Sequence, residues 1–288
     1  MIRSLIGVFS HAHASILLVA ALVLFACTPA ASNSPPSLPG LAPAPTPSTS
    51  PAPGAQPPSL AASRVLPGGL RLEEYALRRE PDLDPLSFLP IEGTQEQVLA
   101  RHAAQRSATY PDRASFDGGN PSLWAPWTDG MLVAELETAH ADPPLQTVKL
   151  RHGNQVLFSA PAGLPSPALP LQGLWTFDGH WALEILMATP DVWAGRIFVD
   201  GELVSEDLGC EDAFGFQLLA GAPFYFCQHQ GLIGAVFGSA EIDLRYNQIP
   251  HYQCCSGTAL NPRQAEDMVA FFAEHEGAWY YVEIGAFE

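Results

Sequence analysis

The sequence LWTFDGHWALEIL, residues 174–186, places Asp178–Gly179 between two apolar runs that are rich in aromatic side chains. A two-residue type I′ turn needs positive φ at both central positions, and Asp-Gly adopts that conformation readily. The stretch therefore predicts a β-hairpin. The sequence RIFVDGELVS, residues 196–205, has the same pattern, with Asp200–Gly201 between two strand-like runs. A third hairpin is expected in FFAEHEGAWYYVEIG, residues 271–285, with Glu276–Gly277 at its tip.

Further runs of strand length follow one another at short spacing between residues 214 and 249. They read FGFQLLAG, PFYFCQHQG, LIGAVFGS and EIDLRYNQI, and each is closed by Gly, Pro or a polar pair. Many short strands without long helices between them are typical of an antiparallel all-β architecture. We therefore expect a mainly β domain whose antiparallel hairpins form a small propeller-like or curled-meander arrangement. A two-sheet sandwich is the alternative.

Helices are expected to be minor. Thr94 followed by Gln97 forms a capping box, which predicts a helix over about residues 95–107. A second, short helix is expected from 262 to 267, because Asn261 could cap it and a proline follows at the first helical position. This segment is then expected to turn into the first strand of the third hairpin.

The N-terminal residues contain an apolar run of eleven residues, ILLVAALVLFA, from Ile16 to Ala26, directly before Cys27. This length is typical of a signal-peptide core and falls short of the roughly 20 residues that a membrane-spanning helix needs. The sequence LFAC at residues 24–27 resembles the lipobox of bacterial lipoproteins. The resemblance implies removal of residues 1–26 and lipidation of Cys27 as the new N-terminus. The alternative is an ordinary secretory signal that contains a cysteine.

Residues 28–67 contain twelve prolines among Ala, Ser, Thr and Gly, and Arg64 is the only charged residue. Such a composition buries too little apolar surface to offset the entropy of ordering the chain. We expect residues 27–67 to form a lipidated, disordered tether, and residues 68–288 to form a single mainly β domain. The expected location is extracytoplasmic, with a lipid anchor in the bacterial cell membrane or outer envelope.

The chain is strongly acidic, with 30 acidic and 13 basic residues and a formal net charge of −17. Removing Arg3 with the signal peptide leaves 12 basic residues against 30 acidic ones, a charge of −18. Nucleic-acid backbones need the opposite sign, so nucleic acid is excluded as a partner. The expected partners are the membrane, through the lipid anchor, and a glycan or another envelope protein. Basic proteins, cationic small molecules and calcium are compatible with the charge.

Four cysteines remain in the exported part: Cys210, Cys227, Cys254 and Cys255. An even number in an exported domain is typical of disulfides. Two arrangements stay open. In one, Cys210 pairs with Cys227 and Cys254 with Cys255. In the other, the pairing is crossed, so that Cys254 and Cys255 link one loop to the ends of two strands. An alternative is a zinc or copper site that would draw on Cys227, His229, His251, Cys254 and Cys255. We expect no metal and no cofactor, because an oxidising compartment consumes free thiols.

Six acidic residues lie between Asp200 and Asp212 and could in principle hold calcium. They are Asp200, Glu202, Glu206, Asp207, Glu211 and Asp212. Their spacing matches no calcium-binding loop, so we expect a solvated hairpin rim.

A candidate binding surface lies on the last predicted strand. Trp279, Tyr281 and Glu283 point to one face of an extended strand, because side chains alternate. Aromatic rings beside a carboxylate suit sugar rings. Glu184 is a candidate for a second carboxylate. The alternative is that these aromatic residues belong to the core.

His251 and Tyr252 adjoin the cysteine pair and could line a pocket. The alternative is a hydrogen-bonded structural role for the histidine. Short catalytic signatures such as Gly-x-Ser-x-Gly and His-Glu-x-x-His are missing. We therefore expect a lipid-anchored binding or envelope-interaction module rather than an enzyme. The alternatives are a glycan hydrolase that uses Glu283 with Glu184, and a structural subunit of a surface assembly.

Overall fold

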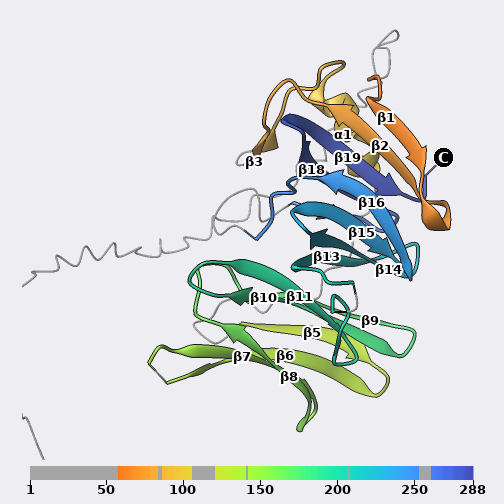
Figure 1. Cartoon of the computed structure of the whole chain (residues 1–288). Helices are drawn as coiled ribbons and strands as arrows, with labels where there is room; N and C mark the ends of the chain where they lie inside the picture. The colour runs from red at the N-terminus through yellow and green to blue at the C-terminus, as the bar shows by residue number, and fades with distance from the viewer. Residues whose placement is uncertain are drawn as a thin grey trace, which may run out of the picture. The chain divides into compact units, whose positions relative to one another are not determined.

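A computed structural model of the chain describes residues 58–83, 86–105, 121–140, 142–206, 208–252 and 261–287 (Figure 1). All of them belong to one of the two compact units of the chain, Ala52–Glu288. Within these residues the chain is mainly β, with antiparallel sheets and one α-helix. The predicted fold class is therefore confirmed.

The three predicted hairpins form at the predicted turns. The strands that they join are β9 (Leu171–Phe177) with β10 (His180–Ala188), β11 (Trp193–Val199) with β12 (Glu202–Leu203), and β18 (Met268–His275) with β19 (Ala278–Gly285). Asp178 and Gly179 have φ of 46° and 82°, and Asp200 and Gly201 have 51° and 92°. Both central positions of each turn are thus left-handed, as the type I′ turn requires.

An antiparallel meander precedes these hairpins. It consists of β5 (Ser122–Trp127), β6 (Gly130–Ala139), β7 (Leu145–His152) and β8 (Gln155–Gly163). The end of β8 pairs with the end of β10 in parallel at one position, Gly163 with Ala188. This pairing joins the two groups into an eight-stranded sheet.

A second meander is a separate sheet of four strands. It consists of β13 (Asp212–Leu219), β14 (Ala222–His229), β15 (Leu232–Phe237) and β16 (Ala240–Tyr246), paired in chain order.

The remaining main sheet combines strands from the two ends of the described chain, in the order β1-β2-β19-β18-β17. Its additional strands are β1 (Ala62–Val65), β2 (Arg71–Ala76) and β17 (Arg263–Gln264). A 3-10 turn, η1 (Pro67–Gly69), links β1 to β2, and β3 (Asp82–Leu83) pairs with β4 (Leu86–Ser87) in a small ladder. None of the described sheets closes on itself, and their number excludes a simple two-sheet sandwich.

The first predicted helix is confirmed as α1 (Gln95–Ala104), and the Thr94 and Gln97 side chains form both bonds of the capping box. The predicted helix at 262–267 is wrong, because residues 263–264 form β17. Asn261 caps no helix. Its side chain instead accepts a hydrogen bond from the main-chain N–H of Phe272 and donates to the carbonyl of Pro250.

Apolar clusters lie between successive groups of strands. One joins β5–β8 to β9–β10, a second joins β10–β11 to β13–β15, and a third joins β13–β16 to the terminal sheet. The far face of the terminal sheet packs against Val98 of α1 and Phe88. Phe271 and Phe272 lie in the clusters on opposite faces of this sheet, as strand alternation requires. The two middle groups of strands, β9–β11 and β13–β16, therefore contribute core residues from both faces.

Candidate functional site

The face of β19 that carries Trp279, Tyr281 and Glu283 is covered by other parts of the protein rather than open to solvent. Tyr281 and Glu283 are both 0% exposed, and Trp279 is half-buried. The Tyr281 ring stacks on Phe88 at 5.6 Å between centroids and packs against Phe272. A sugar ring cannot reach Tyr281 or Glu283 in this arrangement, because neighbouring side chains already cover both.

Glu283 is held by a cation from α1 that lies 182 positions away in the sequence. Arg101 Nη1 lies 2.5 Å from the Glu283 carboxylate and 2.6 Å from that of Glu73. Glu73 and Glu283 are direct cross-strand neighbours on β2 and β19. Burial raises the pKa of Glu283, and the positive charge of Arg101 opposes that rise. Burial, reinforced by the negative charge of Glu283, raises the pKa of Tyr75 to about 12.

Glu184 on β10 is 3% exposed and binds main-chain groups of a neighbouring sheet. It accepts hydrogen bonds from the N–H of Gly215 at 3.0 Å and of Phe216 at 2.8 Å. A β-bulge in β13 interrupts the pairing with β14 at these residues, so Glu184 satisfies donors at the interruption. The Tyr252 hydroxyl donates to the same carboxylate. Burial raises the Glu184 pKa, and these three hydrogen bonds oppose the rise.

His251 lies beside this carboxylate and pairs with Asp212. Its Nε2 is 2.9 Å from Asp212 Oδ2, and its Nδ1 is 2.6 Å from the carbonyl oxygen of Ile249. Both ring nitrogens therefore face hydrogen-bond acceptors. The ring stacks on Phe214 at 3.5 Å, and Asp212 also accepts from the N–H of Gly195 at 2.6 Å.

Three residues singled out in the sequence, Glu184, His251 and Tyr252, therefore meet in one polar cluster, in which Glu184 is buried and the other two are half-buried. Glu283 lies in another, with Arg101 and Glu73. The two carboxylates of the hydrolase hypothesis thus have separate sets of partners, and each set consists of the protein's own groups.

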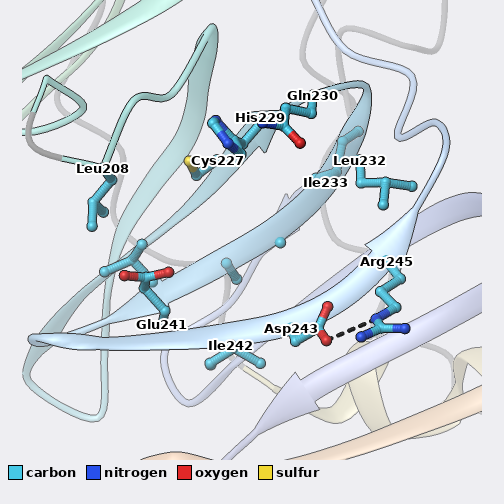
Figure 2. A pocket seen from close by; sticks show the side chains of 13 residues that line it. Leu208, Cys227, His229, Gln230, Leu232, Ile233, Glu241, Ile242, Asp243 and Arg245 are labelled. Atoms are coloured by element: carbon cyan, nitrogen blue, oxygen red, sulfur yellow. Dashed lines mark hydrogen bonds and ion pairs between the residues drawn. The ribbon is translucent and has the colours of Figure 1, made fainter.

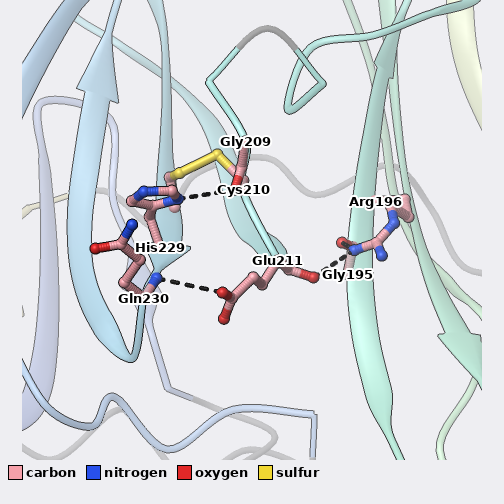
Figure 3. Close-up of a disulfide and its surroundings, with 8 residues drawn as sticks. Gly195, Arg196, Gly209, Cys210, Glu211, His229 and Gln230 are labelled. Atoms are coloured by element: carbon pink, nitrogen blue, oxygen red, sulfur yellow. Dashed lines mark hydrogen bonds between the residues drawn. A yellow bond between two sulfur atoms is a disulfide. The ribbon is translucent and has the colours of Figure 1, made fainter.

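The disulfide between Cys210 and Cys227 is present (Figure 3). Its Cα atoms are 5.4 Å apart, within the usual range for a disulfide. Cys27, Cys254 and Cys255 lie outside the described residues, so the second bridge and the lipidation site stay predictions. Within the described part of the chain, no cluster of three or more His, Cys, Asp or Glu side chains could hold a metal ion.

Three of the described acidic residues between 200 and 212 have separate hydrogen-bond partners rather than a common centre. Asp200 pairs with His180, Glu211 accepts from the N–H of Gln230, and Asp212 pairs with His251. Asp207 is outside the described ranges.

A hollow of about 400 Å³ lies on β14–β16, beside the disulfide (Figure 2). It is lined by apolar, polar and charged residues: Leu208, Cys227, His229, Gln230, Leu232, Ile233, Gly234, Ala235, Val236, Glu241, Ile242, Asp243 and Arg245. Its volume falls within the usual range of small-ligand sites, about 300–1,000 Å³. Apart from Cys227 and His229, sequence reasoning did not single out its residues.

The hollow forms where the pairing of β15 with β16 is irregular. The register shifts between Ile233 and Ala235, and Arg245 on the opposite strand has φ of 62°. A Cβ atom on the intervening Gly234 would lie 2.9 Å from the carbonyl oxygen of Ile242, so this position excludes a side chain. A glycine inside a strand-like run is a signal of such an irregularity, but it does not indicate a hollow.

Hydrogen bonds fix the wall of the hollow that contains the disulfide, as Figure 3 shows. His229 Nδ1 is 3.0 Å from the carbonyl oxygen of Gly209, next to Cys210. The main-chain carbonyl of Glu211 accepts from Arg196 of β11 at 2.7 Å. The wall is thus held on both sides of the disulfide.

Comparison with known proteins found no match: the chain matches no family model, no curated protein and no solved structure. No helix in the described ranges is long and apolar enough to cross a membrane.

Proposed function

We propose that this chain is a lipid-anchored, extracytoplasmic binding or envelope-interaction module, and that it contacts its ligand at the hollow on β14–β16. The observation that carries the proposal is the contrast between this hollow and the other candidate sites. Glu184, His251 and Glu283 are occupied by internal partners. The hollow instead combines an apolar floor at Val236 with an exposed acidic rim at Glu241.

The anchoring part of the proposal rests on the order of an apolar core, a small residue and Cys27, followed by the proline-rich segment. Expression of the full chain with an alkynyl fatty acid should label the wild type. Cys27→Ser should lose the label and leave the membrane fraction. Equal labelling of both chains would contradict lipidation at Cys27.

The binding part can be tested by amide hydrogen exchange on the full chain in detergent. The probes are a basic pentapeptide (pentalysine), an acidic one (pentaglutamate), a neutral one (pentaserine) and soluble peptidoglycan fragments. A ligand of the hollow should slow exchange in β15 and β16, because binding restricts opening of the strands that it touches. Protection confined to other strands, or none with any probe, would contradict the proposed site.

A further inference from the structure

The side chains of the hollow form rows across three strands. Tyr225, Val236 and Glu241 are successive cross-strand partners on β14, β15 and β16, so they share one face of the sheet. In the adjoining row Cys227 lies opposite Gly234. Because Gly234 has no side chain, the surface of the sheet is recessed at this position, and the side chains of the neighbouring rows border the recess.

Glu241 is an acid without an internal counter-ion. Arg245 Nε lies 2.8 Å from Asp243 Oδ2, so these two opposite charges compensate each other, as Figure 2 shows. Glu241 makes no hydrogen bond or ion pair within the described residues, and its side chain is exposed. Among the acidic and arginine side chains that line the hollow, Glu241 is therefore the one negative charge without a partner.

Glu241 lies beside an apolar, buried surface, because its cross-strand partner Val236 and the next residue of that row, Tyr225, are both buried. Burial, reinforced by the negative charge of Glu241, raises the pKa of the Tyr225 hydroxyl to about 12. A carboxylate that acts on a buried neighbour is screened less than one fully surrounded by water. A cation placed beside it would therefore be attracted more strongly than at an ordinary surface acid.

The other polar groups of the lining add hydrogen-bond acceptors. The carbonyl oxygen of Gly209 can only accept, so His229 Nδ1 carries the proton of that contact. In the neutral ring this leaves Nε2 as an acceptor on a residue that lines the hollow. Gln230 supplies an amide oxygen as a further acceptor. These acceptors lie at the other end of the hollow from Glu241, because His229 pairs with Leu232 and Glu241 pairs with Val236, four residues further along β15. They match further N–H donors of a basic chain rather than the cation at Glu241.

We propose that the hollow binds a lysine or arginine side chain of a basic polypeptide, with Glu241 as the counter-ion. This inference rests on the proposed function and names the class of its ligand. An aliphatic stem would lie over Gly234 and against Val236, and the ammonium or guanidinium group would reach Glu241. The net charge of −17 favours a multiply charged partner over a single free amine, because the field of the whole protein steers a basic chain toward it.

The probe for this inference is acetylated, amidated pentalysine, titrated calorimetrically against the full chain at about 150 mM salt, where long-range attraction is screened beyond about 8 Å. Pentalysine acetylated on every Nε atom is the neutral isostere, and free cadaverine distinguishes a simple diamine from a polypeptide. We expect saturable binding of pentalysine, with cadaverine and the acetylated peptide at least about tenfold weaker.

Two variants that change charge in opposite directions test the counter-ion. Glu241→Gln should weaken pentalysine binding about fivefold, which corresponds to ~1 kcal/mol. Arg245→Asn should strengthen it about twofold or more, because Asp243 loses its partner. Asparagine tolerates the left-handed backbone at position 245.

Matched controls carry the same charge changes elsewhere on the surface. Glu92→Gln and Arg79→Asn alter exposed side chains outside the hollow and should change binding less than about 1.5-fold. Equal effects of Glu241→Gln and Glu92→Gln, or no binding of pentalysine by the wild type, would overturn the inference. If a neutral or acidic probe protects β15 and β16 from hydrogen exchange and pentalysine does not, the hollow is a binding site and only the cationic ligand is excluded.

Discussion

The carboxylate of Glu184 on β10 accepts a hydrogen bond from the main-chain N–H of Phe216 on β13, at 2.8 Å. These strands belong to different sheets. The bond, together with that from Gly215, supplies acceptors to two N–H groups at the bulge of β13. A buried acid therefore joins two sheets through their main chain.

Replacing Glu184 with Gln should lower the free energy of unfolding by about 1–3 kcal/mol, because the amide NH₂ would face one of these buried N–H donors and leave it unsatisfied. Urea denaturation at pH 7 measures the change. Glu202→Gln, at an exposed position, is the control and should stay within about 0.5 kcal/mol of the wild type. A Glu184→Gln protein as stable as this control would show that the bulge finds other acceptors.

Replacing Arg101 with Met should destabilise the protein by roughly 3 kcal/mol at pH 7.5, because two buried carboxylates lose their shared cation. The cost should be smaller at pH 4.5. The folded-state pKa of Glu283 lies above its unfolded value of about 4.3. Protonation of Glu283 therefore contributes to the stability of the folded protein, and this contribution is fully present below the unfolded value. The contribution is lost as the pH rises through the folded-state pKa.

Without Arg101 the folded-state pKa of Glu283 should rise further, which makes ionisation at pH 7.5 more costly. Denaturation curves of wild type and Arg101→Met at both pH values measure this difference, with Arg79→Met as the exposed control. A cost that is the same at both pH values would contradict the role assigned to the ion pair.

Replacing Gly195 with Ala should destabilise the contact between β11 and β13. An added Cβ would lie 2.2 Å from the carbonyl oxygen of Ala213 and 2.5 Å from the Tyr252 hydroxyl. Overpacking of this kind typically costs about 1–3 kcal/mol. Gly130→Ala is the matched control, because its nearest neighbour is the ring of His152, whose side chain can move. Thermal unfolding should separate the two variants, and equal melting temperatures would contradict the close approach.

Replacing both Cys210 and Cys227 with Ala should lower the free energy of unfolding by roughly 3 kcal/mol, because the bridge closes a loop with a sequence separation of 17. Denaturation under oxidising conditions measures the loss. Wild-type stability in the double variant would show that the bridge adds nothing. Peptide mapping without reductant should recover the Cys210–Cys227 link, and it tests the separate prediction that Cys254 pairs with Cys255.

Local features of the fold were predictable from the sequence because they depend on neighbours along the chain. Asp178–Gly179 and Glu276–Gly277 predicted their hairpins through the need for positive φ. Thr94 and Gln97 predicted the start of α1 through the capping box. The error at residues 262–267 has the same origin, since capping preferences indicated a helix where pairing with β18 produces a strand.

The candidate sites were less predictable, because burial depends on which sheet covers each face. Alternation correctly placed Tyr281 and Glu283 on one side of β19, but it could not show that α1 covers this side and brings Arg101 to Glu283. Glu184 and Tyr252 were singled out separately, and the packing of β10 against β13 brings them together.

By itself, the sequence determined the mainly β fold, the hairpin turns and the strong negative charge, because these follow from local backbone preferences and composition. Only the tertiary structure decided which acids are buried beside partners and which acid of the hollow on β14–β16 remains without a counter-ion. Glu283 and Glu184 lie where sheets or a helix pack over them, whereas Glu241 lies on the exposed rim of the hollow on β14–β16. The physical reason is that desolvation and Coulomb interactions depend on distances through space, which separations along the chain do not specify.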